Sequence, residues 1–292
     1  MIISSGNNRA KSFFITGDDF GLSREINAGM IGIHQKGNLD GVSLMANGEA
    51  FDDAVSLIKQ HPDLDVGLHL TLVELTPLLS GREVPSLVDK NGFFYADYSQ
   101  FLRAYILGKI RLREIDQEIG AQFEKVQRQG VRITRIDSHQ QLHMVPGILD
   151  IVIKHALKYH VARIRYPYTP LRFNALQFSA HPDKFLGNML LNGLCLYQGR
   201  LLKKYRMIHP DHYCNASNAG GPLGEVLQRF QKTRKSGSWE FSFHPAISEH
   251  ELSKRYPHWR YHWEQEYHEM MRPDFRSRFE GSHSKNHAEN SF

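Results

Sequence analysis

The chain has 292 residues and a formal net charge of +5, with 41% hydrophobic and 23% charged residues. These fractions are ordinary for a soluble globular protein with a sizeable core, and no segment reaches the roughly 20 apolar residues needed to span a bilayer. The mild charge is spread along the chain, which excludes the concentrated basic stripe expected of a nucleic-acid-binding protein.

The cysteines and the amino-terminal residues indicate in which cellular compartment the protein is expected. Cys195 and Cys214 form neither a disulfide framework nor a CxxC metal pair. Residues 1–11 are polar and lack the apolar centre of a signal peptide. We therefore expect a cytoplasmic protein. The length suits one α/β barrel of about 250 residues, and we assign a single barrel domain to residues 12–280, with polar tails at 1–11 and 281–292.

Strands and helices are expected to alternate along the chain, with residues 71–98 as a long irregular stretch. The first expected strand runs from Phe13 to the carboxylates Asp18 and Asp19, and further strands are expected at 41–46, 65–70, 132–139, 162–166 and 239–243. Helices are expected at 24–35, capped by Ser23, and at 51–59, 101–129, 146–159 and 224–234. The pattern is weak at 169–218, and a last helix from about residue 260 runs into a polar tail.

Polar side chains follow several of these strands at their carboxyl ends. They are Asp18, Asp19, His69, His139, Arg165 and His244. Alternating strands and helices argue for a parallel sheet with right-handed crossovers. In an α/β barrel the carboxyl edge of the sheet is where active sites are built. The pattern therefore predicts a (β/α) barrel with its site at this edge.

Three of these residues could form a catalytic metal site. Asp19, His69 and His139 offer one carboxylate and two imidazoles, and three protein ligands plus water is the usual layout of a catalytic zinc. Two adjacent carboxylates repel each other when ionised, so a cation should lie beside them, and Asp18 would then handle a proton. The alternatives are an ordinary Asp-Asp turn and histidines that only make hydrogen bonds in the core or at the surface.

Neighbouring residues could support this chemistry. Asp137 could hold a ligand imidazole from behind, and His143 could be a further ligand or a substrate contact. Arg165 could keep Asp18 ionised and oriented, or pair with a surface acid. Histidine is the side-chain type suited to proton transfer near neutral pH, so His244 could protonate a leaving group.

Four motifs, in this order, resemble those of the YdjC-like carbohydrate deacetylases, which include the chitooligosaccharide deacetylases. The motifs are Thr16-Gly-Asp-Asp-Phe-Gly21, Gly67-Leu-His-Leu70, Asp137-Ser-His139 with His143, and Phe243-His-Pro-Ala246. The resemblance runs from about residue 12 to about residue 250. Residues 72–74, 83–89 and 118–124 further resemble the branch associated with hopanoid biosynthesis.

The resemblance implies a distorted, TIM-like (β/α) barrel related to the polysaccharide deacetylase fold, which removes N-acetyl groups from amino sugars with a divalent metal. The implied roles are metal ligand for Asp19, His69 and His139, general base for Asp18, general acid for His244, support of Asp18 for Arg165, and substrate contact for Asp137 and His143. Gln141 stands where many relatives have a histidine, and the last 40 or so residues match poorly. Imidazole ligands favour zinc, whereas magnesium is the ion usually assigned in this family, so the ion stays open.

The expected substrate is an N-acetylated carbohydrate or a glycolipid such as a glucosaminyl hopanoid precursor. The apolar run at 185–206, with its basic end, could cover a lipid-linked sugar, rest on a membrane surface, or pack on the barrel. A homodimer is left open, and no nucleic-acid partner is expected. Two rival functions remain, a metal-dependent phosphoesterase, which would need more carboxylates if it used two metals, and a non-catalytic sugar-binding protein.

Overall fold

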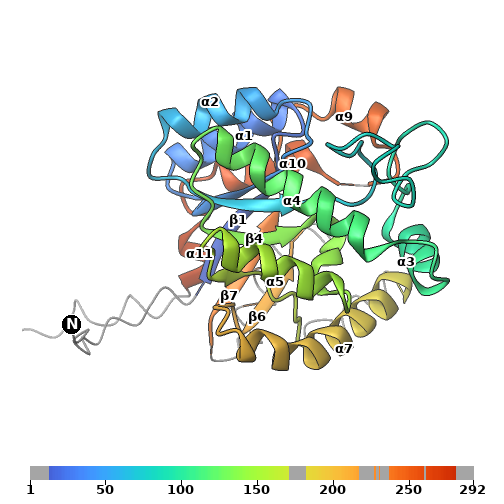
Figure 1. Ribbon diagram of the computed structural model, residues 1–292. Helices are drawn as coiled ribbons and strands as arrows, with labels where there is room; N and C mark the ends of the chain where they lie inside the picture. The colour runs from blue at the N-terminus through green and yellow to red at the C-terminus, as the bar shows by residue number, and fades with distance from the viewer. Residues whose placement is uncertain are drawn as a thin grey trace, which may run out of the picture.

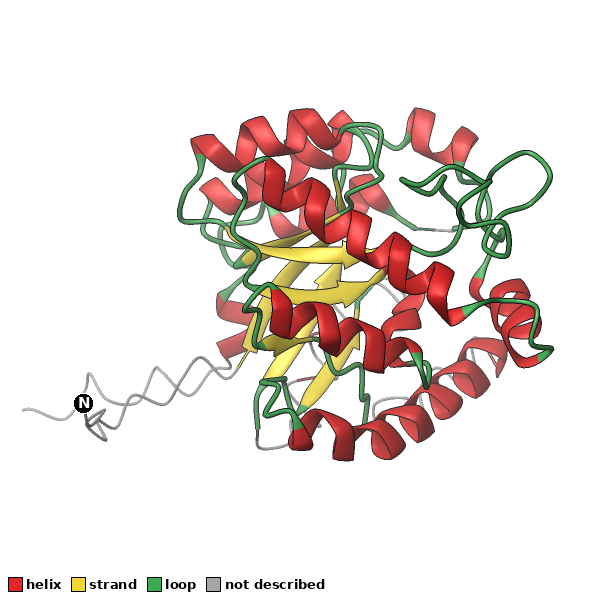
Figure 2. Cartoon of the chain, viewed as in Figure 1, coloured by secondary structure: helices red, strands yellow, loops and turns green. Residues whose placement is uncertain are grey.

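The computed structural model describes residues 13–170, 182–216, 227, 230, 237–259 and 261–280. Within them, parallel strands form one sheet in the order β5-β4-β3-β2-β1-β7-β6. The strands are β1 (Phe13–Phe20), β2 (Gly41–Leu44), β3 (Asp65–Leu70), β4 (Arg135–Ser138), β5 (Arg163–Ile164), β6 (His212–Asn215) and β7 (Trp239–Phe243). The sheet curls, and helices surround it (Figure 1; Figure 2). This is the distorted TIM-like α/β fold that the sequence predicts.

The helices lie mainly between consecutive strands, as right-handed crossovers require. They are α1 (Arg24–Gln35), α2 (Phe51–Gln60), α3 (Tyr98–Ile106), α4 (Leu112–Arg128), the 3₁₀ segment η1 (His139–Met144), α5 (Ile148–Lys158), α7 (Pro182–Lys204), α9 (His250–Arg255), α10 (Trp263–Met270) and α11 (Ser277–Glu280). Within the described residues, none is both long and apolar enough to cross a membrane.

β1 is an interior strand of the sheet, flanked by a strand on each side and covered on both faces. Its residues are buried except for the half-buried Phe14, and it pairs with β2 on one side and β7 on the other. Such two-sided burial explains the nearly continuous apolar run before the first carboxylate. α1 follows, with the Ser23 hydroxyl accepting the Ile26 backbone N–H at 3.2 Å as a helix cap.

The two outer strands approach each other and nearly close a barrel. Ile208, on the segment before β6, bonds to the backbone of β5, with Ile164 N–H donating to Ile208 O at 2.9 Å. Tyr213 of β6 donates its N–H to Tyr168 O, beyond the end of β5, at 2.8 Å. These bonds draw the edges of the sheet together, so the carboxyl ends of all the strands face a common region.

The predicted helix at 101–129 is wrong as one element, because the chain breaks between α3 and α4. Gly108 has a left-handed backbone (φ 69°), and the Lys109 N–H returns to Ala104 O. α3 also begins earlier than expected, where Asp97 accepts the Gln100 N–H at 2.8 Å.

Other boundaries differ as well. β4 is shorter than the predicted strand at 132–139, and His139 begins the 3₁₀ segment instead. The short strand β6 and helix α9 were not expected. The predicted helix at 224–234 and both polar tails lie almost wholly outside the described residues, so they and the domain limits stay predictions.

The loop after β2 packs against Gly21, in the turn that follows Asp18 and Asp19 at the end of β1. Ala50 donates its N–H to Gly21 O at 2.9 Å, and a Cβ added to Gly48 would overlap the backbone carbonyl of Gly21. Gly48→Ala should therefore destabilise the protein by about 1–3 kcal/mol, the usual cost of overpacking. Urea unfolding followed by circular dichroism measures this loss.

The matched control is Gly193→Ala in α7, where nothing lies within 4 Å of the added Cβ. This change should be neutral or stabilising by up to about 1 kcal/mol, because alanine favours the helix over glycine. Equal stability of the Gly48→Ala variant and the wild type would contradict the close approach of these two loops.

Candidate functional site

Asp18 and Asp19 face one site because the end of β1 is irregular. The pairing with β2 shifts register between Gly17 and Phe20, and Asp19 has a left-handed backbone (φ 67°). A regular strand would point the two side chains to opposite faces, whereas a bulge re-aims one of them. His244 Nε2 lies 4.0 Å from an oxygen of each carboxylate, so both face the same space. A left-handed backbone at a non-glycine residue costs on the order of 1 kcal/mol and is typical of functional sites.

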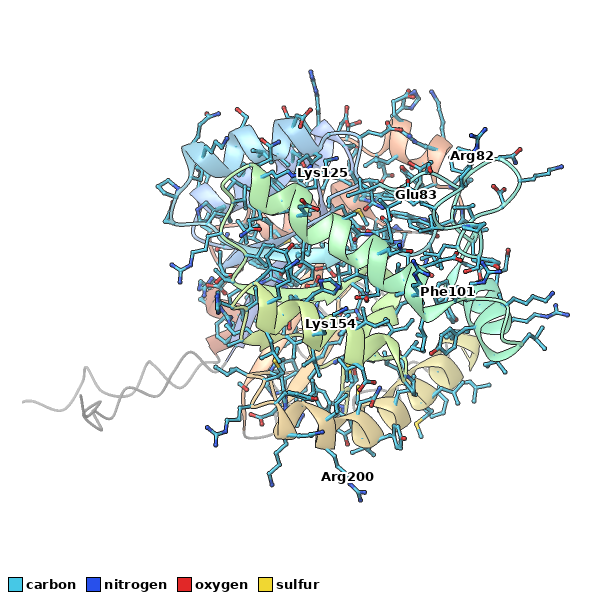
Figure 3. All side chains as sticks on the ribbon, in the orientation of Figure 1. Arg82, Glu83, Phe101, Lys125, Lys154 and Arg200 are labelled. Atoms are coloured by element: carbon cyan, nitrogen blue, oxygen red, sulfur yellow. The ribbon has the colours of Figure 1, made fainter. Side chains whose placement is uncertain are left out.

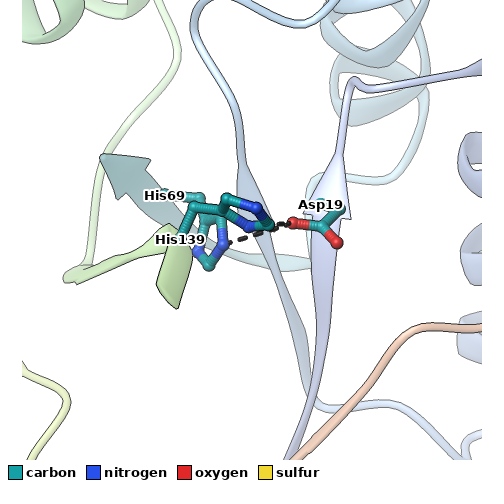
Figure 4. Close-up of side chains that lie close together, drawn as sticks. All are labelled: Asp19, His69 and His139. Carbon is teal, nitrogen blue, oxygen red and sulfur yellow. Dashed lines mark hydrogen bonds and ion pairs between the residues drawn. The ribbon is translucent and has the colours of Figure 1, made fainter. Parts of the chain in front are cut away.

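Asp19 meets two histidines from neighbouring strands (Figure 4). Its Oδ1 lies 3.3 Å from His69 Nε2, at the end of β3, and 3.1 Å from His139 Nδ1, just after β4. One donor atom from each of the three residues lies within 4.8 Å of the others, and all three side chains are buried. The structure thus brings the three predicted metal ligands together.

The second carboxylate oxygen of Asp19 indicates whether these residues fit a metal ion. Asp19 Oδ2 is buried and has no hydrogen-bond partner in the part of the chain that the structure describes. A buried carboxylate oxygen without a partner is costly, so it calls for a cation or another donor. A carboxylate and two imidazoles are suitable ligands for a divalent transition metal. The residues present therefore fit a metal ion at this place.

A second grouping, Asp18 with His69 and Asp137, is close enough for a metal but is already satisfied by the protein. Asp137 Oδ1 accepts from His69 Nδ1 at 2.6 Å, and its Oδ2 accepts from Ser43 Oγ at 2.6 Å and from Arg135 Nη1 at 3.0 Å. These bonds use the oxygens that a metal would need. The grouping around Asp19 is therefore the better candidate.

Arg165 orders the other carboxylate. Its Nη1 and Nη2 donate to the two oxygens of Asp18 at 2.8 and 2.7 Å, while its Nε donates to Glu240 Oε1 at 2.8 Å. Arg165 Nη2 also lies 2.9 Å from Asp137 Oδ2. A planar guanidinium with bidentate contacts fixes both the position and the plane of a carboxylate. Asp18 is therefore held in one orientation beside Asp19.

The carboxylates around the imidazoles of the site raise the pKa of both histidines. Burial alone would lower the pKa of His69, but the charge and hydrogen bond of Asp137, with a further bond to Asp19, raise it to about 9. Burial likewise opposes a charge on His139, yet Asp19 and Glu74 raise its pKa to about 10. Burial would raise the pKa of Asp19, but the two histidines hold it well below its usual range. Asp19 therefore favours its ionised form, which is the form that binds a cation.

His143 lies behind the site. Its Nε2–H donates to Arg165 O at 3.0 Å, and its Nδ1 lies 2.7 Å from Ser138 Oγ. Burial lowers the pKa of His143 to about 4. With both nitrogens used, His143 does not fit the predicted option of a further metal ligand. Substrate contact by Asp137 and His143 stays a prediction, and in the structure their polar atoms bond to protein groups.

Several residues around the site were missed by sequence reasoning. Glu74 follows β3 and bonds to His139, and a carboxyl-terminal segment places Trp259 against His139 and Tyr261 against His244, with ring centroids 4.9 and 4.0 Å apart. No strand end or spacing signals this segment, because it reaches the site through the fold alone. Gln141, the position where relatives often have histidine, donates to Tyr213 Oη at 3.1 Å.

Comparisons with known proteins agree with this architecture. A carbohydrate deacetylase from Brevibacillus brevis is 38% identical over 154 residues, which cover 53% of this chain and 58% of that protein. One from Geobacillus stearothermophilus is 36% identical over 54% of this chain and 59% of that protein. One from Listeria monocytogenes is 35% identical over 61% of this chain and 68% of that protein. The first two matches thus span about three-fifths of those relatives' length.

A solved structure shares the fold. It is a protein from Enterococcus faecalis named for cellobiose-phosphate cleavage, which superposes with a TM-score of 0.68 over 92% of this chain and 93% of its own, at 22% identity. The family model described as YdjC-like protein matches residues 12–281. Because this match covers nearly the whole chain, the protein belongs to the YdjC-like family.

Proposed function

We propose that the protein is a metal-dependent hydrolase that removes the N-acetyl group from an amino sugar. The observation that carries the proposal is the buried group of Asp19, His69 and His139, in which Asp19 Oδ2 has no hydrogen-bond partner among the described residues. The names of the curated relatives, carbohydrate deacetylases, support the reaction class.

A divalent ion held by Asp19, His69 and His139 would lower the pKa of a water molecule and polarise the amide carbonyl. Two imidazoles favour zinc by ligand chemistry, and magnesium is the other candidate. The remaining roles belong to the side chains around this group.

Asp18 is the proposed general base. Arg165 holds both its oxygens in place, which orients the carboxylate toward the space it shares with Asp19 and His244. Such orientation lowers the activation free energy, because the proton acceptor is in position before the reaction starts. Arg165 is then a positioning residue for Asp18.

His244 is the proposed general acid. Its backbone N–H donates to Glu266 Oε2 at 2.6 Å, and its ring stacks on Tyr261. These contacts fix the imidazole, with Nε2 4.0 Å from each carboxylate. A protonated His244 can deliver a proton to the departing amine of the sugar.

The substrate class and the metal dependence are tested together. The protein should release acetate from N-acetylated glycans or glycolipids, lose this activity when a chelator removes the metal, and regain it with added Zn²⁺ or Mg²⁺. Mass spectrometry of the sugar and metal analysis of the protein are the measurements. Phosphate release from sugar phosphates would instead support a phosphoesterase, and sugar binding without turnover would support a binding protein. Full activity in metal-free protein would exclude the proposed site.

Replacement of the proposed base gives a sharper test. Asp18→Asn should lower kcat by about 100-fold or more, because the amide cannot take a proton in the reaction. Zn²⁺ affinity should stay within a few-fold of wild type, since Asp18 is not among the proposed ligands. Asp52→Asn, an exposed change on α2, is the control and should leave kcat unaltered. Near-normal turnover by Asp18→Asn would remove Asp18 from the base role.

A membrane-surface contact is proposed as an addition, on the basis of α7. Its outer face exposes large apolar side chains, which are Leu186, Leu190, Leu196 and Tyr197, at 63–69% exposure. Its carboxyl end adds exposed basic residues, and Arg200 projects away from the body of the protein (Figure 3). An apolar face next to cationic side chains is the pattern of a helix that lies on an anionic lipid surface. Such a contact would suit a glycolipid substrate.

Vesicle sedimentation tests this contact. The wild type should bind vesicles that contain anionic phospholipid, and the double change Leu186→Ser with Leu190→Ser should weaken binding several-fold, because it removes apolar area from the face. Leu157→Ser, at an exposed leucine of α5, is the matched control. Absence of wild-type binding to anionic vesicles would exclude the membrane contact and leave the deacetylase proposal intact.

A further inference from the structure

Glu74 stands out among the residues around the site. It lies on the loop after β3, its side chain is only 4% exposed, and its backbone is left-handed (φ 71°). A left-handed non-glycine residue costs free energy that the surrounding contacts must offset. Those contacts are two histidines: Glu74 Oε2 lies 2.6 Å from His139 Nε2, and Oε1 lies 3.0 Å from His258 Nε2.

The contact with His139 matches that of the other candidate ligand. His69 presents Nε2 to Asp19 and Nδ1 to Asp137 at 2.6 Å. His139 presents Nδ1 to Asp19 and Nε2 to Glu74, also at 2.6 Å. Each imidazole thus has one nitrogen at Asp19 and the other on a buried carboxylate. A carboxylate behind a ligand imidazole orients the ring and raises its basicity.

We propose that Glu74 is a positioning residue that orients His139 for metal binding and ties the carboxyl-terminal segment to the site. The inference rests on the proposed metal site at Asp19, His69 and His139. In this proposal Glu74 orients the His139 ring, just as Asp137 contacts and orients the His69 ring.

The second oxygen of Glu74 connects it to the carboxyl-terminal segment, through His258. His258 adjoins Trp259, whose ring packs on His139 and on Tyr256, with centroids 4.9 and 4.4 Å apart. Glu74 therefore contacts His139 directly and, through His258, the segment that covers it. Trp259 is 8% exposed, so this cover keeps water from one face of the imidazole. Exclusion of water strengthens the charge interactions inside the site.

The test is Zn²⁺ affinity, measured by isothermal titration on the full chain without substrate. Glu74→Gln keeps the shape of the side chain but removes its charge, and it should weaken Zn²⁺ binding by about 10–100-fold. Asp137→Asn should have an effect of the same size. Glu83→Gln, an exposed carboxylate on the same loop that bonds only within the loop to Ser80, should stay within about twofold of the wild type.

A second variant separates the two contacts of Glu74. His258→Ala removes the tie to the carboxyl-terminal segment but leaves the bond to His139, so Zn²⁺ affinity should change less than in Glu74→Gln. Circular dichroism spectra that match the wild type show that each variant folds.

The failures are distinguishable. Unaltered Zn²⁺ affinity in folded Glu74→Gln would overturn the positioning role and leave the metal site standing. An equal loss in His258→Ala would also overturn it, because the effect would then come from the covering segment. A wild type that binds no divalent ion would overturn the metal site and the role of Glu74 together.

Discussion

Two adjacent, buried carboxylates at the end of the interior strand β1 are the constraint on which the arrangement of the site depends. Asp18 and Asp19 face the same space because β1 bulges at that point, and two ionised carboxylates so close repel each other. Removing such a charge from water is costly unless partners surround it. Arg165 supplies these partners for Asp18, and two histidines supply them for one oxygen of Asp19. Among the described residues, the other oxygen of Asp19 has no hydrogen-bond partner, which fits the proposed cation.

A ring of buried charges holds these partners in place. Asp137 contacts His69, Arg135 and Arg165, and therefore joins three neighbouring strands through one carboxylate. Arg165, Arg135 and His69 outweigh the effect of burial and lower the pKa of Asp137. Loss of one member of a buried charge pair typically costs 3–5 kcal/mol, because the other charge is left without a partner. The network therefore couples the orientation of the site to the packing of the sheet.

The proposed roles of the side chains follow from which of their polar atoms already have hydrogen bonds to protein groups. The oxygens of Asp137 and both nitrogens of His143 bond to protein groups, which suits support of the site. His244 Nε2 lies 4.0 Å from an oxygen of each carboxylate, which suits proton transfer. Selectivity for a sugar would come from the loops at the carboxyl edge of the sheet, where the chain has few regular elements, as is common in barrel enzymes.

Local sequence patterns were enough to predict the parallel α/β architecture and the edge of the sheet that carries the candidate site. Apolar runs that end in Asp18-Asp19, His69, His139 and His244 are local features, and parallel strands bring their carboxyl ends together whatever the details of the loops. The start of α1 could also be predicted, because the Ser23 side chain caps the first turn of the helix.

The break at Gly108, the strand β6 and the contacts of Glu74, His258 and Trp259 depend instead on contacts between distant parts of the chain. A left-handed residue such as Glu74 is stabilised by partners 65 and 184 residues away in the sequence, so no local pattern signals it. β6 is four residues long and is held by β7 and by the chain beyond β5. Local sequence can place a ligand at the end of a strand, but which groups stand behind that ligand depends on contacts that exist only after the chain has folded.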